Sequence, residues 1–366
     1  MPIYEQKLQN DITAIKREVA ILGGMVRQAL ADSVTALFNG DEQLANLTVL
    51  RDYPINRQYQ KLNRQCHNFI ARHLPSAGHL RLVTSVIQMI IDLERVGDYA
   101  RTISRETIHM HYIPEGVVLQ NLQQLARQAQ DILQNSLLAF DQDDVTLART
   151  TLAACNQGSQ NLNAIFQDLT GIYERDAGRE AAVRLLDLHS IAYMLERVGN
   201  RAANVCEEVL FILAGETVAA RRHDILFLDQ DGACLAPLAA VMANKGYGQM
   251  ARFRSAGQQA SSAFPPHLLA FLQHHGLSLQ ERVPCSMATI MQDIDNINII
   301  VSLQGAFDKS AVRLPFHTTL LEWKVGEAPP ATLDALEAVD RYEEIFRTLS
   351  VRLGELMAIL VGETER

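Results

Sequence analysis

Two copies of one short motif constrain the fold of this chain more than any other feature. Segments 93–98 (LERVGD) and 195–200 (LERVGN) are identical at five of six positions and lie about 100 residues apart. A repeat of this kind, in equivalent places of two similar stretches, indicates an internal duplication. The fold must therefore contain two copies of one structural unit.

Long helical periodicities surround both copies. Apolar residues recur at steps of three and four along residues 12–37, which predicts one helix of roughly 50 Å. Further helices are expected at about 41–73, 80–111, 119–140, 144–174 and 180–213, separated by polar or Gly/Pro breaks. Three long helices in each copy predict two tandem antiparallel three-helix bundles, with repeats at about 1–114 and 115–217.

The sequence changes character after residue 217. Short apolar runs near 223–228, 251–255, 297–303 and 319–323 alternate with helical stretches near 237, 266–275, 286 and 330–361. Strands that alternate with helices favour a parallel sheet. The expected fold class is therefore mainly α, with two tandem antiparallel three-helix bundles (1–217) followed by an α/β domain with a parallel sheet (223–366).

Composition excludes several classes of protein. The net charge of −9 argues against a nucleic-acid partner. The five cysteines are scattered without a CxxC pair, so neither a zinc–thiolate site nor a disulfide framework is indicated. The N-terminus lacks the apolar run of a signal peptide, and no stretch is long and apolar enough to span a bilayer. We therefore expect a soluble protein of a reducing compartment.

The first motif copy carries two acids on one helix face. Glu94 and Asp98 are four residues apart, so both carboxylates project from the same side. Together with acids from a neighbouring helix they could hold a hard cation. The alternative is that they pair with Arg101 and Arg105 on the same stripe. The adjacent stripe is expected to be core, with Gly97 admitting a neighbouring helix; its members are Ile90, Leu93, Gly97, Ala100 and Ile103.

The extended motifs, 92–100 (DLERVGDYA) and 194–208 (MLERVGNRAANVCEE), resemble the PhoU family over residues 1–217. The resemblance implies tandem three-helix bundles in a cytoplasmic, non-enzymatic regulator of phosphate uptake and phosphate signalling. It implies partners in a phosphate ABC transporter and its sensor kinase. We also expect a homodimer that is at most peripheral to the membrane. Some family members carry iron or zinc clusters on these acidic faces, so iron, zinc or another divalent cation is the cofactor to test.

Carried over by position, the resemblance implies metal ligands at Glu94 and Asp98 and, on the preceding helix, at Asp52 and Asn56. Pro54 lies within that step and is expected to kink the helix and turn the two side chains off a common face.

The second copy offers Glu196 as its single acid among the matching positions. The other matching positions carry amides, which are weaker ligands than carboxylates: Asn156, Gln160 and Asn200.

The C-terminal region resembles the low-molecular-weight tyrosine phosphatase and arsenate reductase fold over about residues 223–361. The likeness rests on the strand and loop at 225–237, on 254–257 (RSAG), and on Trp323 followed by 327–329 (EAP). That family needs a cysteine nucleophile after the first strand and an arginine six residues later. Here these positions hold Asp229 and Leu235.

The other residues of the expected site do not restore the chemistry. Cys234 stands one residue before the arginine position, so it does not replace the nucleophile. Gln304 follows the strand where a further thiol would be expected, and Glu327 has no nucleophile to serve as an acid.

Three hypotheses follow for this domain. The leading one is a pseudo-phosphatase within a non-enzymatic regulator. The alternative is an active phosphatase that uses Asp229 as an aspartyl nucleophile, with Asp231 completing an Asp-x-Asp spacing. The third is an adaptor that only mediates dimerisation or docks a partner.

Overall fold

The computed structural model describes residues 3–110, 112–155, 178–216, 222–259, 261–279, 283–291, 294, 297–305, 314, 318–330, 333 and 335–361. The chain divides into two compact units, Met1–Val218 and Ala219–Arg366. Each unit has its own hydrophobic core. No helix among these residues has the length and apolar character needed to cross a bilayer.

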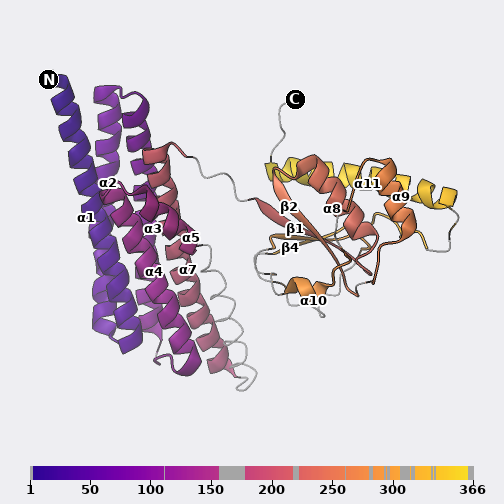
Figure 1. The fold of residues 1–366 in the computed structure, drawn as a ribbon. Coiled ribbons are helices and arrows are strands. Elements are labelled where there is room, and N and C mark those ends of the chain that lie inside the picture. Colours follow the sequence, from indigo (N-terminus) through magenta and orange to yellow (C-terminus); the bar gives the residue numbers. More distant parts are fainter. Residues whose placement is uncertain are drawn as a thin grey trace. The chain divides into compact units, whose positions relative to one another are not determined.

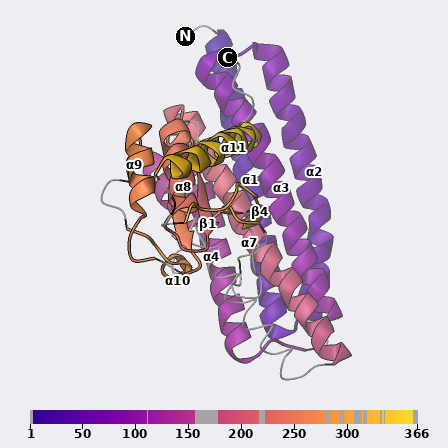
Figure 2. The ribbon, with the colours of Figure 1, turned by 90° about the vertical axis from the view of Figure 1, so that its right-hand side faces the viewer.

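The N-terminal unit is built from long helices that lie side by side (Figures 1 and 2). Their bounds are α1 Ile3–Asn39, α2 Glu42–His73, α3 Ala77–His109, α4 Gly116–Asp141, α5 Val145–Cys155 and α7 Arg179–Ala214. They confirm the helices expected from periodicity. The helix expected at 144–174 is described only as far as Cys155, and its remainder lies outside the described residues.

Local sequence explains where these helices begin and end. The apolar seam of α1, from Ile12 to Leu37, is buried throughout, so α1 folds against the other helices along most of its length. Gly40 ends α1 with a positive φ of 64°, a conformation that glycine adopts without strain. Asp41 then caps α2, because its side chain accepts a hydrogen bond from the backbone N–H of Leu44.

The expectation that Pro54 turns Asp52 and Asn56 off a common face is wrong. The helix α2 runs continuously through Pro54, and Asn56 Nδ2 donates to Asp52 Oδ2 at 3.0 Å. The two side chains therefore share one face. A proline inside a helix removes one N–H from the helical ladder and crowds the carbonyl four residues before it, and α2 packs against α1 and α3 along its length.

The C-terminal unit is a four-stranded parallel sheet with strand order β2-β1-β3-β4. The strands are β1 His223–Asp229, β2 Ala251–Gly257, β3 Ile299–Ser302 and β4 Thr319–Glu322. The sheet confirms the expected α/β class.

Helices pack on both faces of the sheet. They are α8 Leu235–Tyr247, α9 Pro266–His274, α10 Met287–Ile290 and α11 Ala335–Val361 (Figure 1). Alternate residues of β1 face opposite layers. Ile225 and Phe227 join the core beneath α8, α9 and α11, and Leu226 and Leu228 join the smaller core on the side of α10.

The strand order makes the carboxyl end of β1 the expected ligand-binding position of this unit. The chain leaves β1 toward β2 on one side, and β3 lies on the other side, so the carboxyl end of β1 is a topological switch point. Open α/β sheets bind their ligands at such points. Asp229 and the loop that follows it occupy this position.

Candidate functional site

The first motif copy divides into a core stripe and an acidic stripe. The core stripe is fully buried, as expected from sequence. Gly97 admits a close approach of α2, because a Cβ atom built there would lie 3.1 Å from Ile55 Cγ2. In the second copy, a Cβ on Gly199 would meet only Ile132 Cδ1, at 4.0 Å. The space beside the glycine is therefore tight in the first copy and open in the second.

The structure brings together the site residues expected on the first bundle. Asp52 of α2 is buried, at 6% exposure, and faces the half-buried Glu94 and Asp98 of α3. Arg101 bridges the two helices: its Nη1 donates to Asp52 Oδ2 at 2.6 Å, and its Nη2 lies 2.9 Å from Asp98 Oδ1. We call Asp52, Glu94, Asp98 and Arg101 the acid cluster.

Negative charge exceeds positive charge in the acid cluster. Burial raises the pKa of Glu94, and the neighbouring charges of Asp98 and Asp52 raise it further. Burial also raises the pKa of Asp98, although Arg101 opposes that shift. Three carboxylates thus share a single guanidinium inside the cluster. The expected pairing of the acids with an arginine is confirmed for Arg101, and the cation site stays a prediction.

The acid cluster as arranged suits a guanidinium better than a divalent ion. Arg101 already bonds an oxygen of Asp52 and an oxygen of Asp98, the two aspartates that a bridging metal would need. Within the described parts of the chain, no three His, Cys, Asp or Glu side chains are placed to hold one ion. Two further oxygens, Asp52 Oδ1 and Asn56 Oδ1, are buried without a hydrogen-bond partner. Arg101 bonds the other oxygen of Asp52 and leaves these two unoccupied.

The second motif copy presents fewer acids at the equivalent positions. Glu196 is half-buried on α7, and Asn200 is exposed. Asn156 and Gln160 lie outside the described residues.

The two motif copies contact each other directly, one on α3 and the other on α7. The sequence alone does not predict this contact. Arg201 donates to Tyr99 Oη at 3.4 Å, and these two residues are 102 positions apart, the period of the repeat. Arg201 Nη1 also donates to Asp92 Oδ1 at 3.1 Å, and Asn204 Nδ2 lies 3.3 Å from both carboxylate oxygens of Asp92. Asp92 is 8% exposed, so this joint is a buried, charge-assisted link between the repeats.

The switch point of the C-terminal sheet is filled by the chain itself. Asp229 is 4% exposed, and its carboxylate turns into the loop that follows β1. Asp229 Oδ1 accepts the backbone N–H of Gly232 at 2.5 Å, and Oδ2 accepts that of Ala236, in the first turn of α8, at 2.9 Å. Amides at a helix N-terminus ordinarily attract an anion. Here the anion is a side chain of the same loop.

The described positions where a nucleophile and an arginine were expected carry neither. Burial raises the pKa of Cys234 to about 12, so its thiol is protonated near neutral pH, and the thiol lies 3.3 Å from Tyr342 Oη. Leu235 is buried at the position expected for arginine. Gln304 accepts the backbone N–H of Gln230 at 2.8 Å, and Glu327 is exposed. Burial raises the pKa of Asp229 itself to about 6, against the opposing effect of its amide bonds.

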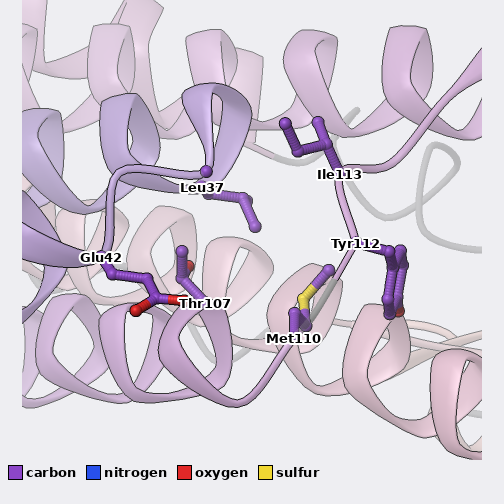
Figure 3. Close-up of a pocket in the computed structure, with 7 residues that line it drawn as sticks. Leu37, Glu42, Thr107, Met110, Tyr112 and Ile113 are labelled. Atoms are coloured by element: carbon purple, nitrogen blue, oxygen red, sulfur yellow. The ribbon is translucent and has the colours of Figure 1, made fainter.

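A separate pocket lies at one end of the first bundle and carries no catalytic grouping (Figure 3). Its volume is about 300 Å³, and it lies where the turn between α1 and α2 meets the end of α3. Glu42 and Thr107 are polar, and the rest of the lining is largely apolar: Leu37, Gly40, Met110, Tyr112 and Ile113. Among the described lining residues Glu42 is the single charged group, and one carboxylate does not make an active site.

Comparison with known proteins assigns the N-terminal unit to a family. The PhoU domain family matches twice, over residues 19–107 and 122–209. The phosphate-specific transport system accessory protein PhoU of Escherichia coli is 29% identical over 206 residues, which is 56% of this chain and 85% of that protein. The crystal structure of PhoU from Pseudomonas aeruginosa is 27% identical with a TM-score of 0.52, covering 57% of this chain and 99% of that chain.

The C-terminal part is matched by structures with arsenate reductase and tyrosine phosphatase folds. One of them, an arsenate reductase in its reduced state, is 14% identical with a TM-score of 0.30, covering 37% of this chain and 98% of that chain. A likeness this slight says nothing about activity. Motif, repeat, helix arrangement and family match agree for the other unit: the N-terminal unit of this chain is a tandem pair of PhoU domains.

Proposed function

We propose that this protein is a regulatory accessory protein of phosphate transport that acts by binding partner proteins in the cytoplasm. The observation that carries the proposal is the tandem pair of PhoU domains, whose relatives include accessory proteins of phosphate-specific transport. The expected partners are a phosphate ABC transporter and its sensor kinase. The link between α3 and α7 is compatible with this role, because it joins the two repeats into one unit.

The C-terminal unit has no catalytic role in this proposal. Both oxygens of the Asp229 carboxylate are engaged by loop amides, so neither faces a substrate. The buried thiol of Cys234 is protonated, and no arginine stands at Leu235 to clamp an oxyanion. The unit therefore acts as a binding module or adaptor.

A pull-down tests the partner proposal. The full-length tagged chain is incubated with detergent-solubilised membranes that carry a phosphate ABC transporter, and with matched membranes that lack it. We expect the transporter subunits to be retained specifically. Failure to retain either the transporter or its sensor kinase, with a correctly folded chain, would contradict the proposal. Light scattering on the same preparation tests the expected homodimer.

The alternative function is a phosphatase with Asp229 as an aspartyl nucleophile. It predicts turnover of an aryl phosphate that Asp229→Ala abolishes, together with an acyl phosphate that hydroxylamine releases. We expect neither, because the carboxylate is buried and bonded to its own loop. Turnover that the Asp229→Ala variant loses would overturn the non-catalytic proposal.

Metal binding at the acid cluster is expected to be weak or substoichiometric. An iron, zinc or other divalent ion would compete with Arg101, which already bonds one oxygen of Asp52 and one of Asp98. Titration calorimetry with Mn²⁺ should show at most weak binding in the full chain. Tight metal that survives in a Glu94→Gln, Asp98→Asn variant would refute this placement.

A further inference from the structure

One face of α2 carries a row of side chains that no other part of its own unit covers. Leu47, Leu50 and Tyr53 are 52%, 58% and 65% exposed, and Arg57 and Arg64 continue the same row. We call these five residues the α2 outer stripe. Steps of three, three, four and seven keep them on one side of a helix, over about 25 Å. Figure 2 shows α2 along the outer edge of the N-terminal unit.

The α2 outer stripe is opposite to the face that α2 buries. Ile55, Leu62 and Cys66 point into the bundle, and Asp52 turns inward to the acid cluster. Asp52 is the only acid in α2 after its first residue, Glu42. The outward face of α2 from Gln43 to His73 therefore carries no acidic side chain, although the whole chain has a net charge of −9.

Basic side chains also flank the α2 outer stripe on the side of α1. Three of them are paired with acids of that helix, namely Arg51 with Asp32, Lys61 with Glu18 and Arg72 with Asp11. No ion pair joins Arg57 or Arg64 to another described residue. The stripe thus combines three exposed apolar side chains with two uncompensated guanidinium groups.

We propose that the α2 outer stripe binds the surface of an anionic membrane. Leucine and tyrosine side chains enter the boundary between headgroups and acyl chains, and arginines bind lipid phosphates. A second copy of the chain is a poor occupant, because its identical stripe would bring two more arginines to the contact and no acid to pair with them. The overall negative charge would repel an anionic bilayer, so binding must come from this local face.

Vesicle co-sedimentation tests the proposal with the full chain. We expect the protein to sediment with phosphatidylglycerol-containing vesicles at low salt, to remain in solution with pure phosphatidylcholine vesicles, and to be released by added salt. Each arginine is expected to contribute about a fivefold factor in affinity, so Arg57→Gln/Arg64→Gln should bind about 25-fold more weakly. Leu47→Ser/Leu50→Ser should weaken binding about tenfold.

A matched control carries the same charge change elsewhere. Arg341→Gln/Arg347→Gln removes two exposed arginines of α11, and it should bind vesicles like the unmodified chain. All these positions are exposed, so the folded state should survive, and circular dichroism checks this for each variant. Absence of binding to anionic vesicles, or equal losses in stripe and control variants, would overturn the proposal. The vesicles contain no protein, so this result is independent of the phosphate-transport role.

Discussion

Replacing Asp229 with asparagine should change how the stability of the C-terminal unit depends on pH. Burial raises the pKa of this carboxyl from 3.8 to about 6 in the folded unit. The folded state therefore holds its proton more tightly than the unfolded state does. The resulting stabilisation is fully present below about pH 4 and is lost as the pH rises through about 6.

The size of the effect follows from the shift. A difference of roughly two pKa units at about 1.4 kcal/mol per unit corresponds to about 3 kcal/mol. Most of this change, about 2.5 kcal/mol, should appear between pH 4 and pH 7 as a fall in the free energy of unfolding of the unmodified chain minus that of Asp229→Asn. Asparagine keeps the shape of the side chain but does not titrate. Groups common to both proteins cancel in the difference.

The assay is urea unfolding at a series of pH values, monitored by tryptophan fluorescence. The chain has one tryptophan, Trp323, which is buried in the C-terminal unit beside Phe227. Its signal therefore reports the unfolding of this unit alone. Glu327→Gln is the control, since Glu327 is exposed. A flat difference curve, or one that rises with pH because the loop amides lower the pKa of Asp229, would refute the reasoning.

Three further outcomes follow from the packing. Gly97→Val should destabilise the N-terminal unit by about 1–3 kcal/mol, because the added side chain would crowd Ile55. Gly199→Ala should raise the stability of this unit by up to about 1 kcal/mol. Circular dichroism during urea unfolding measures both changes, and equal effects would contradict the difference in packing between the two copies. Arg101→Gln should cost about 3 kcal/mol because Asp52 is left charged and buried, and adding Asp52→Asn should recover part of the loss; no recovery would show that Asp52 is not the cause. At neutral pH a thiol reagent should react with Cys155 and Cys285 before Cys66, Cys206 and Cys234, whose pKa values burial raises to about 12; rapid modification of Cys234, mapped by mass spectrometry, would disprove its burial.

The secondary structure was predictable because its signals are local. The seam of α1 and the Asp41 cap lie within a few residues of the elements they define, and the structure places both as expected. Pro54 shows the limit of local reasoning. A proline signals a kink in an isolated helix, but packing against α1 and α3 held α2 together and kept Asp52 and Asn56 on one face.

The candidate sites were only partly predictable. Glu94 and Asp98 could be named from their spacing, and the acid that joins them, Asp52, from the resemblance. The bonds of Arg101 to both aspartates could not be predicted from the sequence, because a contact between α2 and α3 depends on how the two helices pack. The sequence already shows that α2 contains only one acid after its first residue, which is the signal for the α2 outer stripe. Its meaning required knowing that this acid, Asp52, is buried.

By itself, the sequence determined the duplication, the helical class of the first unit, the alternation of strands and helices in the second, and the presence of Asp229 and Leu235 at and after the end of its first strand. Residue identity and periodicity carry that information without any knowledge of distances. Only the tertiary structure decided that Arg201 of one repeat would bond Tyr99 and Asp92 of the other, and that the Asp229 carboxylate would turn inward and satisfy the amides of its own loop. The first is a contact between residues about 100 positions apart in the sequence. The second depends on burial, because a carboxylate removed from water needs the buried amides as hydrogen-bond donors.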